Sequence, residues 1–196
     1  IKETVTSDNV ITTLGAIIAI GVVIMLTYRS LSIPIILLIA IEASIWINLS
    51  YSYFNGISIA YIGFMVISAV QLGATVDYAI LFANGYLENR KEYNKHDSAI
   101  NTLKTSTGAI LTSGTILALA GFTLGKISTN EVIAQLGILI GRGAILSMIS
   151  VLFFLPTVLI ICDKLIEKTH HKELVLNFDK LNNFVIKHNK VILVIF

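Results

Sequence analysis

The stretch Gly73-Ala74-Thr75-Val76-Asp77-Tyr78 places a carboxylate inside a run of otherwise uncharged residues, 57–83. A run of this length is long enough to cross about 30 Å of hydrocarbon as an α-helix. An ionised side chain at that depth costs roughly 2.5–3.5 kcal/mol on membrane-insertion scales. We therefore expect Asp77 to have a partner or a task, and we interpret the rest of the chain as the structure that surrounds this acid.

Composition places the chain among polytopic membrane proteins. Of its 196 residues, 55% are hydrophobic and 13% are charged, whereas soluble domains carry about 25% charged residues. The net charge of +2 and the lack of a nucleic-acid-binding motif argue against a nucleic-acid partner. The single cysteine, Cys162, cannot form an internal disulfide and has no companions at metal-ligand spacing, so we expect no metal site.

Five apolar runs predict an all-α transmembrane helical bundle. The runs are 10–28, 33–54, 57–83, 107–124 and 132–162. Residues 6–8 (Thr-Ser-Asp) are candidate N-caps for the first run, and Pro156 is expected to kink the fifth. The predicted divisions are the end of an external domain (1–9), a five-span transmembrane domain (10–163), an amphipathic linker (164–190) and the start of a further, truncated span (191–196).

Basic residues predict the orientation of these spans. Eleven of the fourteen fall in connections on one side, and only Lys2 and Lys126 fall in connections on the other. The richer side is expected to be cytoplasmic, which puts the amino end of the chain outside. The polar cytoplasmic connection 88–106 is expected to be helical in part. A chain that starts outside without a targeting signal is expected to follow an earlier span, so we interpret it as a fragment.

Asp77 is a candidate proton-binding group. A carboxylic acid removed from water holds its proton more readily than one in water, and the adjacent Tyr78 offers a hydroxyl that can donate or accept. Gly73, one turn away, leaves room on the same face for a neighbouring helix or for water. The alternative is a buried carboxylate that is hydrogen-bonded to another helix for packing alone.

Two further sets of residues are candidate relay or packing partners. Glu42 is a second acid inside a predicted span, at a depth similar to that of Asp77, so it could share a proton with Asp77 or face a separate cavity. A hydroxyl on another span could equally well satisfy Glu42. Thr112 and Ser113 lie at about the depth of Asp77 on the fourth run, where a hydroxyl could bond the carboxylate. Ordinary helix packing is the alternative for both.

The fourth and fifth runs also carry packing signals. Small residues on one helical face of the fourth run predict a close contact with another helix. They are Gly114, Ala118, Gly121 and Gly125. In the fifth run, Arg142 is expected near the outer interface. There it would extend toward lipid headgroups, and we prefer this to a role as counter-ion of Asp77.

The pattern Gly73-x-x-x-Asp77-Tyr78, followed by the polar exit 86–90 (Tyr-Leu-Glu-Asn-Arg), resembles the fourth transmembrane helix of the resistance-nodulation-division (RND) superfamily, and its MMPL branch most closely. The stretches 99–125 and 137–156 are similar to the helices that follow in that family. The resemblance implies that the chain corresponds to spans two to six of one half of a twelve-span transporter with large external domains.

The resemblance implies a transporter driven by the proton-motive force, without a bound cofactor, that exports lipids or other hydrophobic compounds across a bacterial cytoplasmic membrane. Asp77 and Tyr78 would belong to its proton relay, whereas Glu42 does not match a relay position of the family. The implied partners are membrane lipids, a hydrophobic substrate and the remaining half of the transporter with its external domains, with a homo-oligomer as a further candidate.

Alternatives of other classes also fit the sequence. A lipid-binding sensor module would be similar to the sterol-sensing domains of eukaryotic proteins, which share the five-span arrangement. A scaffold subunit of a membrane assembly is the other alternative. Because the sequence carries no nucleotide-binding motif and no soluble-enzyme constellation, we do not expect an enzyme.

Overall fold

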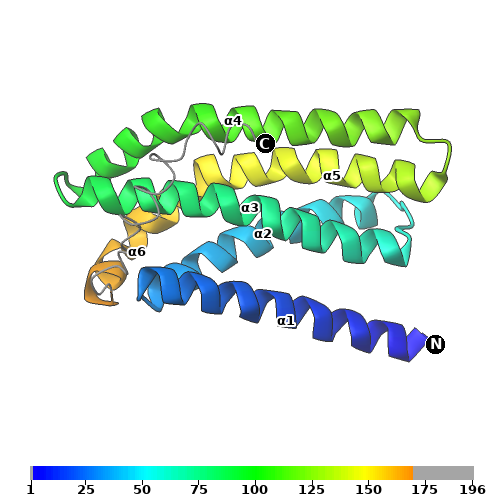
Figure 1. Ribbon diagram of the computed structural model, residues 1–196, viewed down its shortest axis with the longest axis horizontal. Helices are drawn as coiled ribbons and strands as arrows, with labels where there is room; N and C mark the ends of the chain where they lie inside the picture. The colour runs from blue at the N-terminus through cyan, green and yellow to red at the C-terminus, as the bar shows by residue number, and fades with distance from the viewer. Residues whose placement is uncertain (1, 170–196) are drawn as a thin grey trace, which may run out of the picture.

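The structure is a bundle of long helices that lie side by side. It is a computed structural model that describes residues 2–169, with side chains from residue 11 onward except that of Ile62. No strand occurs in this part of the chain, and five segments are helical, long and apolar enough to cross a membrane. Figure 1 shows the helices running along the long axis, with α1 at one edge and α4 at the other. The predicted all-α membrane bundle is confirmed.

The first two helices are α1 (Lys2–Tyr28) and α2 (Ser32–Phe54). The caps predicted at residues 6–8 are wrong, because the backbone is already helical from the start of α1. The polar segment 2–9 contains neither glycine nor proline, so nothing in it prevents the helix from extending beyond the apolar run. Pro34 lies in the first turn of α2, where a proline ring is tolerated.

The next two helices, α3 (Tyr61–Arg90) and α4 (Lys95–Ile127), are joined by a short turn at residues 91–94. The side-chain oxygen of Asn94 accepts hydrogen bonds from two backbone amides at the start of α4, which satisfies donors that a helix end leaves free. The helical character expected within 88–106 is confirmed. α4 begins well before the apolar run because its first turns bury residues such as Thr102 against the bundle.

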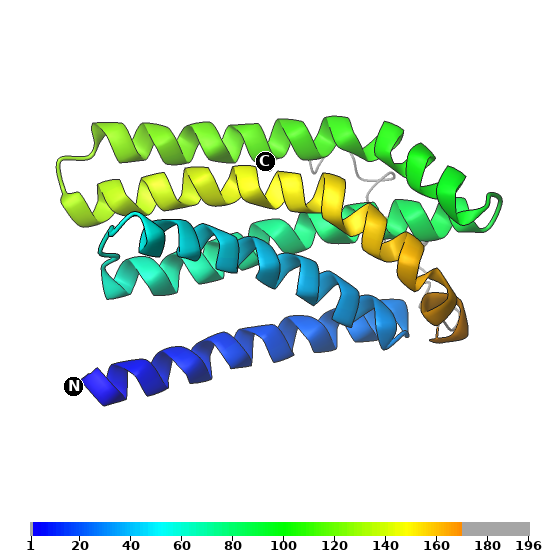
Figure 2. The same ribbon diagram turned by 180° about the vertical axis from the view of Figure 1, so that it is seen from behind.

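The long fifth run is divided into α5 (Glu131–Ile149), a π-helical turn η1 (Ser150–Phe154) and α6 (Leu155–Thr169). Pro156 explains the division, because its ring removes a backbone N–H and crowds the preceding turn. Figure 2 shows α6 turning away from the axis of α5, so the predicted kink is confirmed. The remainder of the predicted linker and the predicted further span, 170–196, lie outside the described residues.

α4 and α5 pack backbone against backbone through glycines. A Cβ atom added at Gly121 would lie 2.5 Å from the Gly141 nitrogen and 2.8 Å from the Gly137 carbonyl oxygen. Gly125 meets α5 in a similar way, with the carbonyl oxygen of Ala134 at 3.1 Å from an added Cβ. The close-packing face that the small residues of α4 predict is therefore confirmed.

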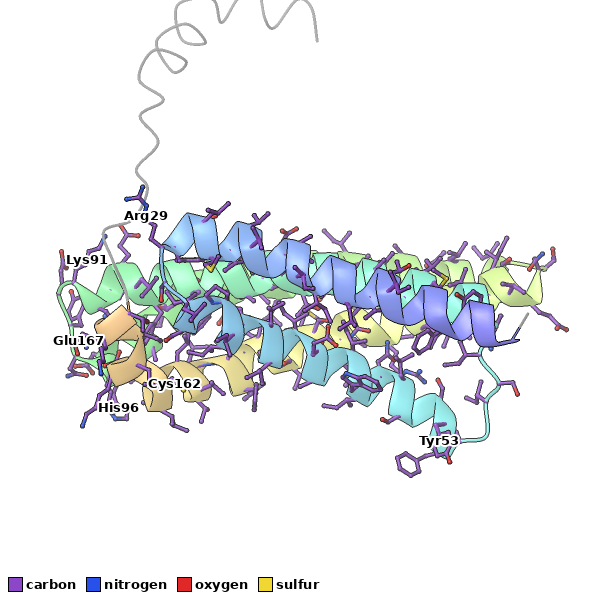
Figure 3. All side chains as sticks on the ribbon, turned by 90° about the horizontal axis from the view of Figure 1, so that it is seen from below. Arg29, Tyr53, Lys91, His96, Cys162 and Glu167 are labelled. Atoms are coloured by element: carbon purple, nitrogen blue, oxygen red, sulfur yellow. The ribbon has the colours of Figure 1, made fainter. Side chains whose placement is uncertain are left out.

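The two ends of the bundle differ in charge. Figure 3 shows Arg29, Lys91, His96 and Glu167 at one end and Tyr53 at the opposite end. We call the first the basic end and the second the far end. α1 begins at the far end and lies at the edge of the bundle. Of the residues in its apolar segment 11% are buried, compared with 56% for α2.

Candidate functional site

Asp77 lies near the middle of α3, about 24 Å along the helix axis from Tyr61 and about 20 Å from Arg90 at the usual helical rise. Its side chain is exposed in the bundle. A stripe of exposed residues at helical spacing surrounds it, and we call this stripe the open face of α3. Its members are Val70, Gly73, Asp77, Leu81 and Asn84.

The open face leaves the Asp77 carboxylate without a partner inside the described chain. No hydrogen bond or ion pair to Asp77 occurs among residues 11–169. A Cβ atom added at Gly73 would meet no atom within 4 Å, so the space that the sequence predicted beside this glycine is present. The carboxylate is therefore available to water or to a protein surface that covers this face.

Tyr78 points in a different direction from Asp77. Successive residues of a helix are rotated by about 100°, and the Tyr78 side chain is 8% exposed and packs in the core. The structure therefore splits the adjacent pair between the open face and the interior.

The hydroxyls predicted near Asp77 do not contact it. Thr112 is exposed on α4 and donates to the carbonyl oxygen of Gly108, one turn back in its own helix, at 2.8 Å. Ser113 is also exposed. Neither side chain bonds Asp77 in the described part of the chain.

Glu42 opens into a small pocket between α1, α2 and α3. The pocket has a volume of about 70 Å³, enough for several water molecules. Its walls include Trp46, Phe64 and Leu72. Asp77 does not line this pocket. The structure thus places the two acids in separate surroundings, as in the second of the arrangements considered for Glu42.

A network of polar side chains joins α2, α3 and α5 between the middle of the bundle and the far end. We call it the polar core. Its members are Ser44, Asn48, Ser52, Gln71, Thr75, Arg142 and Ser147. At its centre, Asn48 is fully buried and donates to the Gln71 side-chain oxygen at 2.8 Å and to the Leu139 carbonyl at 3.1 Å. Such buried amides need these partners, because an unpaired one is costly.

The polar core reaches α3 close to Asp77 on the buried side of the helix. The Thr75 hydroxyl donates to the Gln71 carbonyl oxygen at 2.6 Å. The Ser147 hydroxyl of α5 lies 2.6 Å from the Thr75 hydroxyl. Gly143 makes room for the bond between Asn48 and Gln71, since a Cβ atom there would lie 2.7 Å from the Gln71 side-chain oxygen and 2.8 Å from the Asn48 side-chain nitrogen. α2, α3 and α5 are thus held in register next to the site.

Arg142 is oriented differently from the sequence prediction. The expectation was a side chain that extends toward lipid headgroups, but the guanidinium turns toward α2. Its Nε donates to the Asn48 side-chain oxygen at 2.7 Å and its Nη2 donates to the Ser52 hydroxyl at 2.7 Å. The guanidinium carbon also lies 4.3 Å from the Tyr51 ring centroid. No ion pair joins Arg142 to Asp77 within residues 11–169, in keeping with the preference against a counter-ion role.

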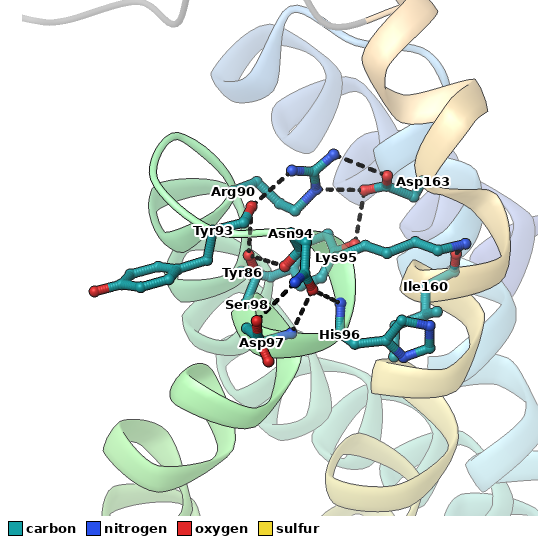
Figure 4. Close-up of polar contacts among 10 residues, drawn as sticks. All are labelled: Tyr86, Arg90, Tyr93, Asn94, Lys95, His96, Asp97, Ser98, Ile160 and Asp163. Atoms are coloured by element: carbon teal, nitrogen blue, oxygen red, sulfur yellow. Dashed lines mark hydrogen bonds and ion pairs between the residues drawn. The ribbon is translucent and has the colours of Figure 1, made fainter.

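A second polar cluster ties α3 to α6 at the basic end. Asp163 is 7% exposed and accepts hydrogen bonds from Arg90 Nε at 2.8 Å, Arg90 Nη2 at 3.0 Å and the Tyr86 hydroxyl at 2.7 Å, as Figure 4 shows. This forked geometry is the strong form of an arginine–carboxylate pair. We call it the basic-end clamp.

The polar core and the basic-end clamp were not predicted from the sequence. The available signal was the presence of amides inside apolar runs, at Asn48 and Gln71, because such groups must be bonded once they are buried. The signal for the clamp was the acid Asp163 at the end of an apolar run, with Arg90 at the end of another. Neither signal names the partner, which depends on how the helices pack.

These features define a polytopic membrane protein with an ionisable group at mid-depth on an uncovered helix face. The model of the MMPL family matches residues 1–177 of the chain, and the chain belongs to that family. The resemblance to the MMPL branch that the Asp77 motif carries is therefore confirmed.

Curated relatives are membrane proteins of bacteria. The chain is 25% identical over 153 residues to the putative membrane protein SCO0839 of Streptomyces coelicolor, covering 74% of the chain and 21% of the relative. It is 24% identical over 149 residues to the probable transport protein MmpL12 of Mycobacterium tuberculosis, covering 74% and 13%. It is 24% identical over 164 residues to the putative membrane protein ActII-3 of Streptomyces coelicolor, covering 81% and 23%. The chain thus spans less than a quarter of the length of these relatives.

Proposed function

We propose that this chain is a transmembrane part of a proton-driven transporter that exports lipids or other hydrophobic compounds, with Asp77 as the proton-binding group and Tyr78 beside it in the relay. The observation that carries the proposal is the position of Asp77: mid-depth in α3, on the open face, without a partner among residues 11–169. Family membership and the relative named as a probable transport protein support it.

Protonation of Asp77 changes what can pack against the open face. The carboxylate form requires water or a polar partner, because a bare charge in hydrocarbon is costly. The neutral acid tolerates an apolar neighbour. A proton that enters the site also carries charge through the membrane potential, which is worth about 2.3 kcal/mol per 100 mV. Proton binding could thus drive an exchange between two packings of α3.

The occupants of the open face would come from the rest of the transporter. The remaining half of the protein would lie against the stripe around Asp77, and the external domains would lie beyond the far end. The basic residues clustered at the basic end support a cytoplasmic location for that end. Bacterial relatives support a bacterial cytoplasmic membrane as the location.

The pocket at Glu42 favours one alternative function. It lies between the edge helix α1 and the central helices, and it is lined largely by apolar side chains. A lipid-binding sensor module without transport would use such a pocket and would not need Asp77 to change its protonation state. Transport is the property that separates the two functions.

The experiment uses cells that express the whole protein and a hydrophobic dye whose accumulation reports export. Asp77→Asn keeps the size of the side chain but cannot carry the proton, so the expected result is dye accumulation equal to that of cells treated with a protonophore. Glu88→Gln is the matched control, since Glu88 is an exposed acid near the end of the same helix. Export by Asp77→Asn at the wild-type rate would refute the proposal. Transport by the purified protein alone in proteoliposomes would exclude a scaffold role.

A further inference from the structure

No acidic side chain among residues 11–169 pairs with the Arg142 guanidinium, which contacts only neutral groups there, the Tyr51 ring included. A guanidinium stays protonated in proteins, and taking it out of water costs several kcal/mol unless a partner offsets the loss. All of its hydrogen-bond acceptors are neutral: the side chain and carbonyl of Asn48 and the hydroxyl of Ser52. The one ion pair within residues 11–169 is that of the basic-end clamp.

Part of the guanidinium is also unused. The bonds to α2 involve Nε and Nη2, and no acceptor among the described residues bonds the two N–H groups of Nη1. The N–H groups of a guanidinium are arranged as a planar fork whose spacing matches the oxygens of a phosphate or carboxylate. A half-buried cation with a free donor edge therefore has room for an anionic oxygen.

Arg142 lines a pocket of about 310 Å³ at the far end of the bundle. The other walls are largely apolar and include Ile57, Ile59 and Ile138. The loop that forms one wall is fixed to α5 by Gln135, whose side chain bonds the carbonyl of residue 58 at 2.5 Å and the amide of residue 60 at 2.9 Å. The pocket thus combines a cation with a preformed apolar surface.

The surroundings of the pocket indicate the interfacial level of a membrane. Exposed aromatic residues mark this end of α2: Tyr51, Tyr53 and Phe54. Aromatic side chains of this kind gather where lipid headgroups meet the hydrocarbon. An amphiphile whose phosphate lies at this level would bring its acyl chains to the apolar walls.

We propose that this pocket binds the phosphate group of a phospholipid, with the Arg142 guanidinium as the phosphate ligand and the acyl chains along the Ile57 and Ile138 wall. The pocket contains one opposing charge, Glu131, about 16 Å from Arg142 along the axis of α5. At that distance Glu131 does not pair with the guanidinium, and screening leaves it little effect on an anion bound there. Asp77 does not line this pocket, so phospholipid binding there can be tested independently of proton-driven transport.

The test uses the whole protein purified in a neutral detergent and three probes: dioleoylphosphatidate, dioleoylglycerol with the same chains but no phosphate, and glycerol 3-phosphate with no chains. Binding is measured by native mass spectrometry. Wild-type protein is expected to bind dioleoylphosphatidate in preference to both other probes. Arg142→Gln should weaken that binding about tenfold, because it removes charge-assisted hydrogen bonds. Lys126→Gln, which removes an exposed cation outside the pocket, should leave it unchanged.

A second variant separates ligand binding from folding, since Arg142→Gln also removes bonds within the polar core. Ile57→Lys adds a cation to the wall of the same pocket and should strengthen binding of dioleoylphosphatidate, a gain that misfolding cannot produce. Equal binding of dioleoylphosphatidate by wild type and Arg142→Gln, or no gain in Ile57→Lys, would overturn the proposal. Equally tight binding of glycerol 3-phosphate would show a site for a free phosphate ester instead of a lipid.

Discussion

The glycine contact between α4 and α5 gives a prediction whose magnitude follows from the structure. Gly121→Ala adds one methyl group at a point where the nearest atoms of α5 belong to the backbone of Gly137 and Gly141. The added Cβ would lie 2.5 Å from the Gly141 nitrogen, where ordinary contact begins at 3.4 Å. Backbone atoms cannot rotate aside, so the two helices must separate.

Gly108→Ala is the matched control on the same helix. A Cβ atom at Gly108 would meet nothing within 4 Å. Both substitutions gain up to about 1 kcal/mol of helix propensity, so their difference isolates the clash. Overpacking of this size costs about 1–3 kcal/mol. We therefore expect Gly121→Ala to be less stable than Gly108→Ala by that amount.

The assay is reversible unfolding of the whole protein in mixed micelles with a rising fraction of SDS, followed by circular dichroism. The expected result is a transition at lower SDS for Gly121→Ala than for Gly108→Ala. Equal transitions would mean that α4 and α5 do not pack backbone against backbone at Gly121, and the arrangement of the bundle described above would be wrong at that point.

Two further predictions concern the basic end. Asp163→Asn leaves Arg90 without its counter-charge and should destabilise the bundle by about 2–3 kcal/mol. The cost is less than for a fully buried pair because water still reaches the guanidinium. Hydrogen exchange in α6 should become faster, and unchanged exchange would contradict a structural role for the basic-end clamp. Asn94→Ala removes the N-cap of α4 and should lower the stability of that helix end by about 1 kcal/mol. Amide hydrogen exchange should become faster at residues 95–99 only. Exchange equal to wild type there would show that the cap does not stabilise the helix end.

Much of the fold could be predicted from the sequence because membrane spans are local. Length and hydropathy alone located the five spans, since each must cross the same thickness of hydrocarbon and satisfy its own backbone. Pro156 predicted the break in the fifth span for an equally local reason. The ends of α1 and α4 were predicted poorly, because a helix can continue into polar segments without any apolar signal.

The candidate site was only partly predictable, because partners on different helices are not visible in one chain. Asp77 and Glu42 could be singled out from the sequence because a charged side chain is costly in free energy inside a membrane. The helix face that each residue occupies depends on how the helix is rotated within the bundle. Arg142 shows the limit most clearly. Its depth suggested the headgroup region, whereas its contacts with Asn48 depend on the approach of α5 to α2, which the glycine at 143 permits.

The most direct test of the account is whether Asp77 itself binds and releases a proton. Infrared difference spectra of the whole protein in lipid, recorded between alkaline and acidic buffer, show the C=O stretch of each carboxyl group that becomes protonated. Proton binding at Asp77 predicts a band that is present in wild type, Glu42→Gln and Glu88→Gln but absent in Asp77→Asn. A spectrum of Asp77→Asn identical to that of wild type would contradict the central claim.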